Sequence, residues 1–266
     1  MHFPITTGMK TARAGLPVHL AKPAGAGPFP CVIVLHERYG LVQHTTDIAD
    51  QIAAAGYVVA APDLYYAASD QDGLHRGDVR VHAADDEVTE HLDAVRELLA
   101  SADGADVSRL GVVGACQTGR YSFLLGARHP VRACVVLYGA TSGWEASERH
   151  PIPLEKQIAA TSAPVFGVFG EADHTISVPE VQHLRDVLER HDKSYRIMVC
   201  AGAPHGFLNA TMPGRYRAEA ADYVWRELLD YLAANLGEDP AGTSVTWRFE
   251  CAKAADYDFA KNTRQE

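Results

Sequence analysis

Short apolar runs alternate with amphipathic stretches along most of this chain, and that order limits the fold more than any other feature. Nearly continuous apolar runs of this length are typical of strands buried on both faces. The predicted strands are Phe29–Leu35, Tyr57–Ala61, Arg109–Val113, Val131–Leu137, Pro164–Phe169 and Tyr195–Cys200. The predicted helices cover 47–55, 82–100, 178–190 and 215–234, and another begins after Cys116. This order predicts an α/β protein with a mostly parallel central sheet and helices on both faces.

The chain divides into one large unit and a short extension. We find no linker before residue 236, so 1–236 is expected to be a single domain. Within it, 63–80 is expected to be a loop, and 140–162 a long polar loop or small cap. The C-terminal extension, 237–266, opens with a linker-like turn, and Val245, Trp247 and Phe249 alternate like a short strand. The extension could cover a sheet edge, reach a second subunit or be loosely ordered.

Charge and cysteine usage exclude several classes of protein. The formal net charge of -10 argues against a nucleic-acid partner or an anionic membrane surface. Five cysteines without a CxxC pair argue against a disulfide scaffold or a zinc site. There is no apolar run of transmembrane length and no signal-peptide core, so a cytoplasmic protein is expected. We also expect a monomer or homodimer that uses neither a metal nor a cofactor.

The segment Gly114-Ala115-Cys116-Gln117-Thr118-Gly119 is interpreted as a nucleophile elbow of the pattern G-x-nucleophile-x-G, with cysteine where serine is more usual. It follows a predicted strand and precedes a predicted helix, as the elbow requires. The N-terminus of that helix would favour a thiolate at Cys116. The alternative interpretation is a buried structural cysteine beside two chance glycines.

Two further residues follow later strands and complete a catalytic pattern. Asp173 follows the strand at 164–169, and His205 lies in a Gly/Pro-rich loop after the strand at 195–200. Each residue alone is weak evidence. The order Cys116, Asp173, His205, each after its own strand, is that of the α/β-hydrolase fold. In this arrangement Asp173 would orient His205, and His205 would take the proton of Cys116.

The segment from His36 to Gly40 directly follows the first core strand. In this fold such a loop supplies one backbone N–H of the oxyanion hole, and the residue after the nucleophile supplies the other. Arg38 and Gln117 are therefore the predicted oxyanion donors. Glu37 is either a surface glutamate in a turn or a proton acceptor for Cys116.

Taken together, these motifs resemble the dienelactone hydrolase (carboxymethylenebutenolidase) family over roughly residues 10–235. The matching stretches are HERYGL at 36–41, AAGYVVAAPDLY at 54–65, GACQTG at 114–119, GEADH at 170–174 and GAPHGF at 202–207. The resemblance implies hydrolysis of a lactone or small carboxylic ester through an acyl-enzyme on Cys116. It also implies that the resting thiol is neutral until Glu37 takes its proton.

The substrate is less well defined than the reaction. The resemblance implies an arginine four residues after the histidine to hold a substrate carboxylate, but Asn209 stands there. The candidate substrate-binding residues are Arg76, Arg80, Arg120, Tyr39 and Phe207. The alternatives are another acyl-transfer or carbon–carbon bond hydrolase on the same fold, or a non-catalytic homologue that binds a small molecule. A metal enzyme is the weakest option, since no HExxH pattern occurs.

Overall fold

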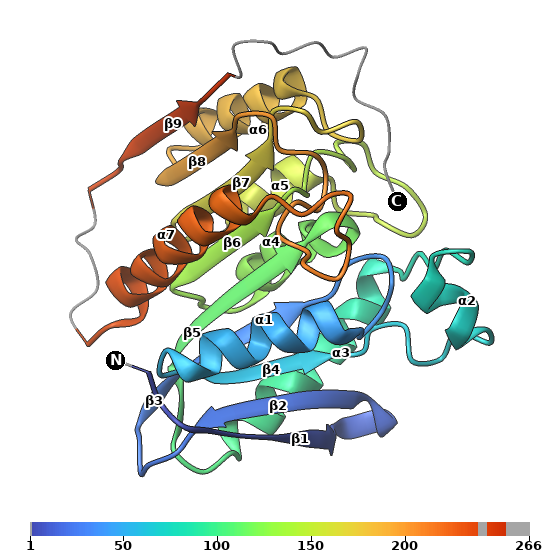
Figure 1. The fold of residues 1–266 in the computed structure, drawn as a ribbon, viewed down its shortest axis with the longest axis vertical. Helices are drawn as coiled ribbons and strands as arrows, with labels where there is room; N and C mark the ends of the chain where they lie inside the picture. Colours follow the sequence, from blue (N-terminus) through green and yellow to red (C-terminus); the bar gives the residue numbers. More distant parts are fainter. Residues whose placement is uncertain (1, 239–243, 254–266) are drawn as a thin grey trace.

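In the computed structural model, residues 2–238 and 244–253 are described, and within them nine strands form one sheet. The sheet order is β1-β2-β4-β3-β5-β6-β7-β8-β9 (Figure 1). The strands are β1 (Ile5–Thr11), β2 (Pro17–Pro23), β3 (Phe29–Leu35), β4 (Val58–Pro62), β5 (Ala105–Ala115), β6 (Ala133–Leu137), β7 (Val165–Gly170), β8 (Tyr195–Cys200) and β9 (Trp247–Cys251). β1 and β2 pair antiparallel, and all pairings from β4 to β9 are parallel.

Helices cover both faces of this sheet, which confirms the predicted α/β architecture (Figure 1). The helices are α1 (Gln43–Ala54), α2 (Gln71–Arg76), α3 (Asp85–Ala100), α4 (Arg120–Arg128), α5 (Leu154–Ala160), α6 (Val178–Arg190) and α7 (Ala218–Leu236), with short 3-10 turns η1 (Arg13–Gly15) and η2 (Cys116–Thr118). α1 and α7 pack on one face, and α3 to α6 supply the core on the other. None of the described helices is long and apolar enough to cross a membrane.

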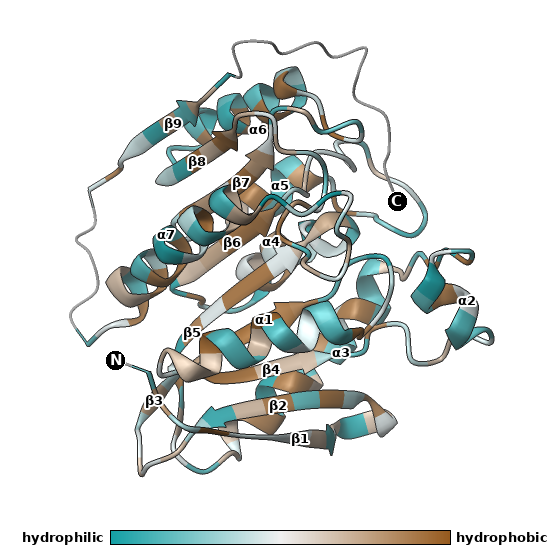
Figure 2. Cartoon of the chain, in the orientation of Figure 1, coloured by the Kyte–Doolittle hydropathy of each residue, from teal (hydrophilic) through white to brown (hydrophobic). Residues whose placement is uncertain are grey.

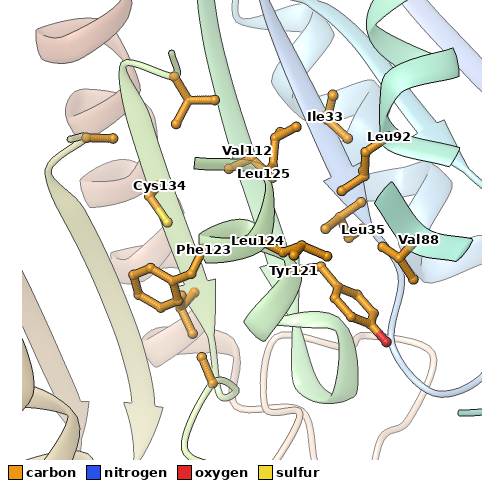
Figure 3. Close-up of a cluster of buried hydrophobic side chains, with 14 of the residues drawn as sticks. Ile33, Leu35, Val88, Leu92, Val112, Tyr121, Phe123, Leu124, Leu125 and Cys134 are labelled. Carbon is orange, nitrogen blue, oxygen red and sulfur yellow. The ribbon is translucent and has the colours of Figure 1, made fainter. Parts of the chain in front are cut away.

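Alternation along the strands explains the two cores. In β3, Ile33 and Leu35 face the core under α3 and α4, whereas Val32 and Val34 face the core under α1 and α7. Figure 3 shows Ile33 and Leu35 beside Val88 and Leu92 of α3. Both faces of the central strands are therefore apolar, and in Figure 2 hydrophilic residues concentrate on the outer surfaces of the helices. This double burial accounts for the nearly continuous apolar runs in the sequence.

Most predicted elements agree with the structure, but several boundaries and short elements differ. β3, α6 and β8 have the predicted bounds, whereas α1 begins at Gln43, before the predicted helix start. The expected loop at 63–80 contains α2, which Asp70 caps at its N-terminus and Gly77 ends in the left-handed region. The expected loop at 140–162 contains α5. Tyr223 of α7 is 41% exposed and lies outside the core.

The C-terminal extension contributes a strand to the sheet. β9 pairs in parallel with β8, in the register Tyr195↔Trp247 to Val199↔Cys251. Phe249 packs against the core, whereas Val245 and Trp247 are about half exposed. β9 therefore covers the sheet edge that β8 would otherwise expose. Covering a sheet edge is one of the three alternatives expected for the C-terminal extension.

Candidate active site

Cys116 lies on a strained turn at the carboxyl end of β5. Its φ of 53° is in the left-handed region, which costs energy for a residue with a side chain. The turn is closely packed: a Cβ on Gly114 would lie 2.5 Å from Ser122 Oγ, and one on Gly119 would lie 3.0 Å from Gly139 Cα. These contacts give a steric reason for glycine at both positions.

The spacing of the elbow differs from the G-x-nucleophile-x-G pattern that the sequence was interpreted to contain. Thr118 occupies the second position after Cys116, and glycine follows one residue later at Gly119. The Thr118 hydroxyl lies 2.6 Å from the His36 carbonyl oxygen and 3.1 Å from that of Ala115. Thr118 therefore joins the elbow to the loop after β3.

Three side chains from different strand ends form a linear hydrogen-bonded chain. His205 Nε2 lies 3.1 Å from Cys116 Sγ, and His205 Nδ1 lies 2.7 Å from Asp173 Oδ2. Asp173 is fully buried, and its Oδ1 accepts hydrogen bonds from the backbone N–H groups of Thr175 (2.7 Å) and Ile176 (2.9 Å). The carboxylate is therefore fixed, and it in turn fixes the imidazole ring.

The environment of His205 favours its charged form. Burial lowers the pKa of His205, but the hydrogen bonds to Asp173 and Cys116 outweigh burial and raise it to about 10. An imidazolium held between a carboxylate and a sulfur atom is suited to stabilise a thiolate. The geometry thus suits nucleophilic catalysis by cysteine.

The loop after β3 is anchored by His36. Its Nε2 accepts a hydrogen bond from the Leu64 backbone N–H at 3.0 Å, so the ring proton is on Nδ1, which donates to the Glu37 carbonyl oxygen at 2.6 Å. Burial lowers the pKa of His36, which keeps this neutral tautomer. The anchored loop carries Glu37 and the backbone N–H of Arg38 to the same cavity as Cys116 and Gln117.

Glu37 is buried in the cavity and is not the surface glutamate of the alternative interpretation. It is 5% exposed, and among the described residues its Oε1 has no hydrogen-bond partner. Tyr138 is its neighbour: burial, and then the charge of Glu37, raise the pKa of the Tyr138 hydroxyl well above its usual range. The Tyr138 ring meets the His205 ring edge-on at 5.2 Å, so this tyrosine lies between Glu37 and the histidine.

A cavity of about 400 Å³ opens above Cys116. Tyr39, Arg80 and Arg120 line it, as predicted, together with Arg38 and Gln117. Its further lining residues, which the sequence analysis did not single out, include Tyr138, Thr141, Ser142, His150, His174 and Arg215. The lining is rich in cations although the whole chain is acidic.

Two predicted substrate-binding residues lie elsewhere. Arg76 is exposed and pairs with Asp78 at 2.9 Å, outside the cavity. Phe207 is fully buried in the core under α1 and α7, where it packs against Tyr138. Asn209 is a turn residue, since its Oδ1 accepts hydrogen bonds from the backbone and hydroxyl of Thr211. None of these three residues lines the cavity.

Arg215 is the most informative residue that sequence reasoning missed. It is only 6% exposed, lines the cavity, and follows His205 on the same loop. Its Nη1 and Glu37 Oε1 both lie within 4 Å of the position that a Cβ on Gly206 would take. Nothing in the local sequence distinguishes Arg215 from the exposed arginines near it. Within residues 2–238 and 244–253, no cluster of His, Cys, Asp and Glu side chains could hold a metal ion.

Comparisons with known proteins show which proteins this chain is similar to. A sequence model of the Dienelactone hydrolase family matches residues 16–236. A Methylorubrum extorquens protein named "Putative carboxymethylenebutenolidase" is 32% identical over 222 residues, which are 81% of this chain and 76% of that protein. A "Probable 2-oxo-3-(5-oxofuran-2-ylidene)propanoate lactonase" of Bradyrhizobium is 29% identical, over 82% of this chain and 89% of that one.

A solved structure is similar over nearly its whole length. The crystal structure of a "Putative Dienelactone Hydrolase" from Klebsiella pneumoniae superposes with a TM-score of 0.77 at 29% identity. The match covers 86% of this chain and 99% of that one.

Proposed function

Because this chain belongs to the dienelactone hydrolase family, we propose that it opens a lactone or small carboxylic ester with Cys116 as nucleophile. The observation that carries the proposal is the continuous chain from Cys116 Sγ through His205 to Asp173, with distances of 3.1 Å and 2.7 Å. Nucleophile, base and orienting acid stand within hydrogen-bond reach of one another, as covalent catalysis requires. The open cavity above the sulfur gives a substrate carbonyl access to it.

The reaction proceeds in two stages in this proposal. The thiolate of Cys116 attacks the carbonyl carbon, and the backbone N–H groups of Arg38 and Gln117 stabilise the oxyanion. The bond to the leaving oxygen breaks, and His205 donates a proton to that oxygen. A water molecule then gives its proton to His205 and attacks the acyl-enzyme, which releases the acid and the Cys116 thiolate, and Glu37 returns its proton to the sulfur.

Glu37 acts in this proposal as the group that takes the thiol proton when substrate enters. Its burial in the cavity and its Oε1 without a hydrogen-bond partner among the described residues support this role, since no other described group occupies that oxygen. A thiol that ionises only with substrate present is also protected from oxidation.

The substrate in this proposal carries a negative charge. Arg38 is committed to the cavity wall: its guanidinium donates to the Gly77 carbonyl at 3.0 Å and lies over the Tyr39 ring. Arg120 is paired with Asp85. Arg80 is exposed at the mouth of the cavity, so it is the proposed carboxylate-binding residue. The lactone in the name of the Bradyrhizobium relative bears a carboxylate, which fits such a cavity.

A substrate panel tests the proposal: dienelactones, neutral lactones and short p-nitrophenyl esters, each with wild-type protein and Cys116→Ala. We expect Cys116-dependent hydrolysis of at least one ester or lactone, and faster turnover of carboxylate-bearing lactones than of neutral ones. Labelling of Cys116 without turnover of any compound would favour a non-catalytic binding protein. Cleavage of a vinylogous diketone but no ester would favour a carbon–carbon bond hydrolase.

A further inference from the structure

One buried carboxylate forms hydrogen bonds with several of the elements that surround the mouth of the cavity. Asp85, the first residue of α3, is 4% exposed. Its Oδ1 lies 2.8 Å from His150 Nδ1, and its Oδ2 lies 3.3 Å from Arg120 Nη2. Gln157 of α5 also donates to Oδ2, at 3.4 Å. A single side chain thus links α3, α4, α5 and the segment 141–153.

The two walls of the cavity mouth meet at this carboxylate. One wall is the segment 77–84, which carries Arg80 and His82, and the other is 141–153, which carries His150. The Asp85 backbone N–H donates to the Arg149 carbonyl at 2.9 Å, and the Arg149 guanidinium donates to the His82 carbonyl at 2.9 Å. The walls are therefore joined by backbone and side-chain bonds beside Asp85.

Arg120 supports the second wall from below. It is 7% exposed, and a Cβ on Gly143 would lie 2.9 Å from its Nη1. Gly143 has a φ of 81°, so the segment 141–153 turns directly over the guanidinium. Asp85 compensates the charge of Arg120, so this buried pair supports the second wall.

We propose that Asp85 is a positioning residue that clamps the segments 77–84 and 141–153, and so holds the mouth ready for substrates large enough to touch both walls. The inference rests on the proposed function, because the walls matter through the ester or lactone that passes between them. A wall held in place before binding need not be ordered by the substrate, which lowers KM without changing the chemistry at Cys116. The Asp85 clamp, meaning Asp85 with Arg120, His150 and Gln157, is distinct from the triad.

The chain offers a matched control. His129 Nε2 lies 2.6 Å from Asp93 Oδ1, and this pair also joins α3 to the end of α4. The His129 and His150 side chains are 21% and 22% exposed, but only His150 lines the cavity. His129→Ala therefore removes an equivalent pair at a place where the cavity walls are not involved.

The test compares His150→Ala, His150→Asn and His129→Ala in steady-state kinetics with p-nitrophenyl acetate and p-nitrophenyl hexanoate. For His150→Ala we expect KM for the hexanoate to rise about tenfold, the effect of losing one hydrogen bond to a charged group. The kcat for acetate should stay unchanged. Asparagine can place an amide N–H where His150 Nδ1 lies, so His150→Asn should restore KM. A His150→Ala protein that behaves like His129→Ala, or that loses kcat equally on both esters, would overturn the clamp.

A second readout separates this inference from the proposed function. Glu145 is exposed within the segment 141–153, so cleavage after it by a glutamate-specific protease reports how firmly the segment is held. We expect faster cleavage after Glu145 in His150→Ala than in wild type or His129→Ala, measured by mass spectrometry under native conditions. An unchanged cleavage rate would refute the clamp, whether or not the protein hydrolyses any of the esters. Failure to hydrolyse any ester would refute only the proposed function.

Discussion

The replacement of Asp173 by asparagine should impair catalysis without disturbing the fold. The side-chain oxygen of an asparagine can keep the hydrogen bonds from the backbone N–H groups of Thr175 and Ile176, which Oδ1 accepts at 2.7 and 2.9 Å. Its NH₂ group then faces His205 Nδ1, which must accept. The ring proton moves to Nε2, toward Cys116 Sγ, and His205 can no longer take the proton of the attacking water.

The size of the expected loss in activity follows from the raised pKa of His205. The pKa of His205 is raised from 6.5 to about 10, which at 1.36 kcal/mol per pKa unit is about 5 kcal/mol of imidazolium stabilisation, shared between Asp173 and Cys116. If Asp173 supplies about half, its loss costs about 10²-fold in rate. The wrong tautomer alone costs about 10⁴-fold in a Ser-His-Asp triad. We therefore expect kcat/KM to fall between about 10²-fold and about 10⁴-fold.

The assay is hydrolysis of p-nitrophenyl acetate at pH 7, with thermal unfolding as a check of the fold. Asp93→Asn is the matched control, because Asp93 also binds a histidine, His129, at 2.6 Å, but outside the cavity. Its activity should equal that of wild type. A loss below about tenfold in Asp173→Asn, or about 1.4 kcal/mol, would refute the reasoning.

Three further expectations concern the proton acceptor, the substrate and pH. Glu37→Gln should lower turnover at least about 10²-fold, as for loss of a general base, and should slow substrate-triggered alkylation of Cys116. An unchanged turnover rate together with an unchanged alkylation rate would exclude the proposed role. Arg80→Gln should raise KM for a carboxylate-bearing lactone but not for p-nitrophenyl acetate, whereas Arg76→Gln should change neither; equal effects of the two variants would contradict the carboxylate site. Burial lowers the pKa of His44. Below about pH 6.5 the unfolded chain therefore binds a proton at this histidine that the folded chain does not bind. Stability falls as pH falls through that range. The free energy of urea unfolding should therefore change less steeply with pH in His44→Asn, by at most about 1.36 kcal/mol per pH unit, and identical slopes would argue against this linkage.

The sequence predicted the central sheet well because burial on both faces leaves a strong local pattern. β3 and β8 have the predicted bounds, and the start of α6 is sharply defined by Ser177 and Glu180, which cap each other's backbone. β1 and β2 were not predicted. β1 is exposed along most of its length, and the antiparallel pair lies at the sheet edge, so its strands lack a continuous apolar run.

The site was predicted where a residue follows a strand, and missed where it depends on distant contacts. Cys116, Asp173 and His205 each follow a strand, so their order alone placed them together. Arg120 was expected to bind substrate, yet it pairs with Asp85, which is 35 residues away in the sequence. Arg215 reaches the cavity only through the path of the loop after β8, which no local pattern specifies.

The central claim is that Cys116 forms the covalent bond to the substrate. The most direct test is the rate at which Cys116→Ala hydrolyses the best ester or lactone of the panel, measured on protein whose circular dichroism and thermal unfolding match wild type. The account predicts no turnover above the uncatalysed rate, because neither His205 nor Asp173 can replace the sulfur. Normal turnover by well-folded Cys116→Ala protein would contradict it.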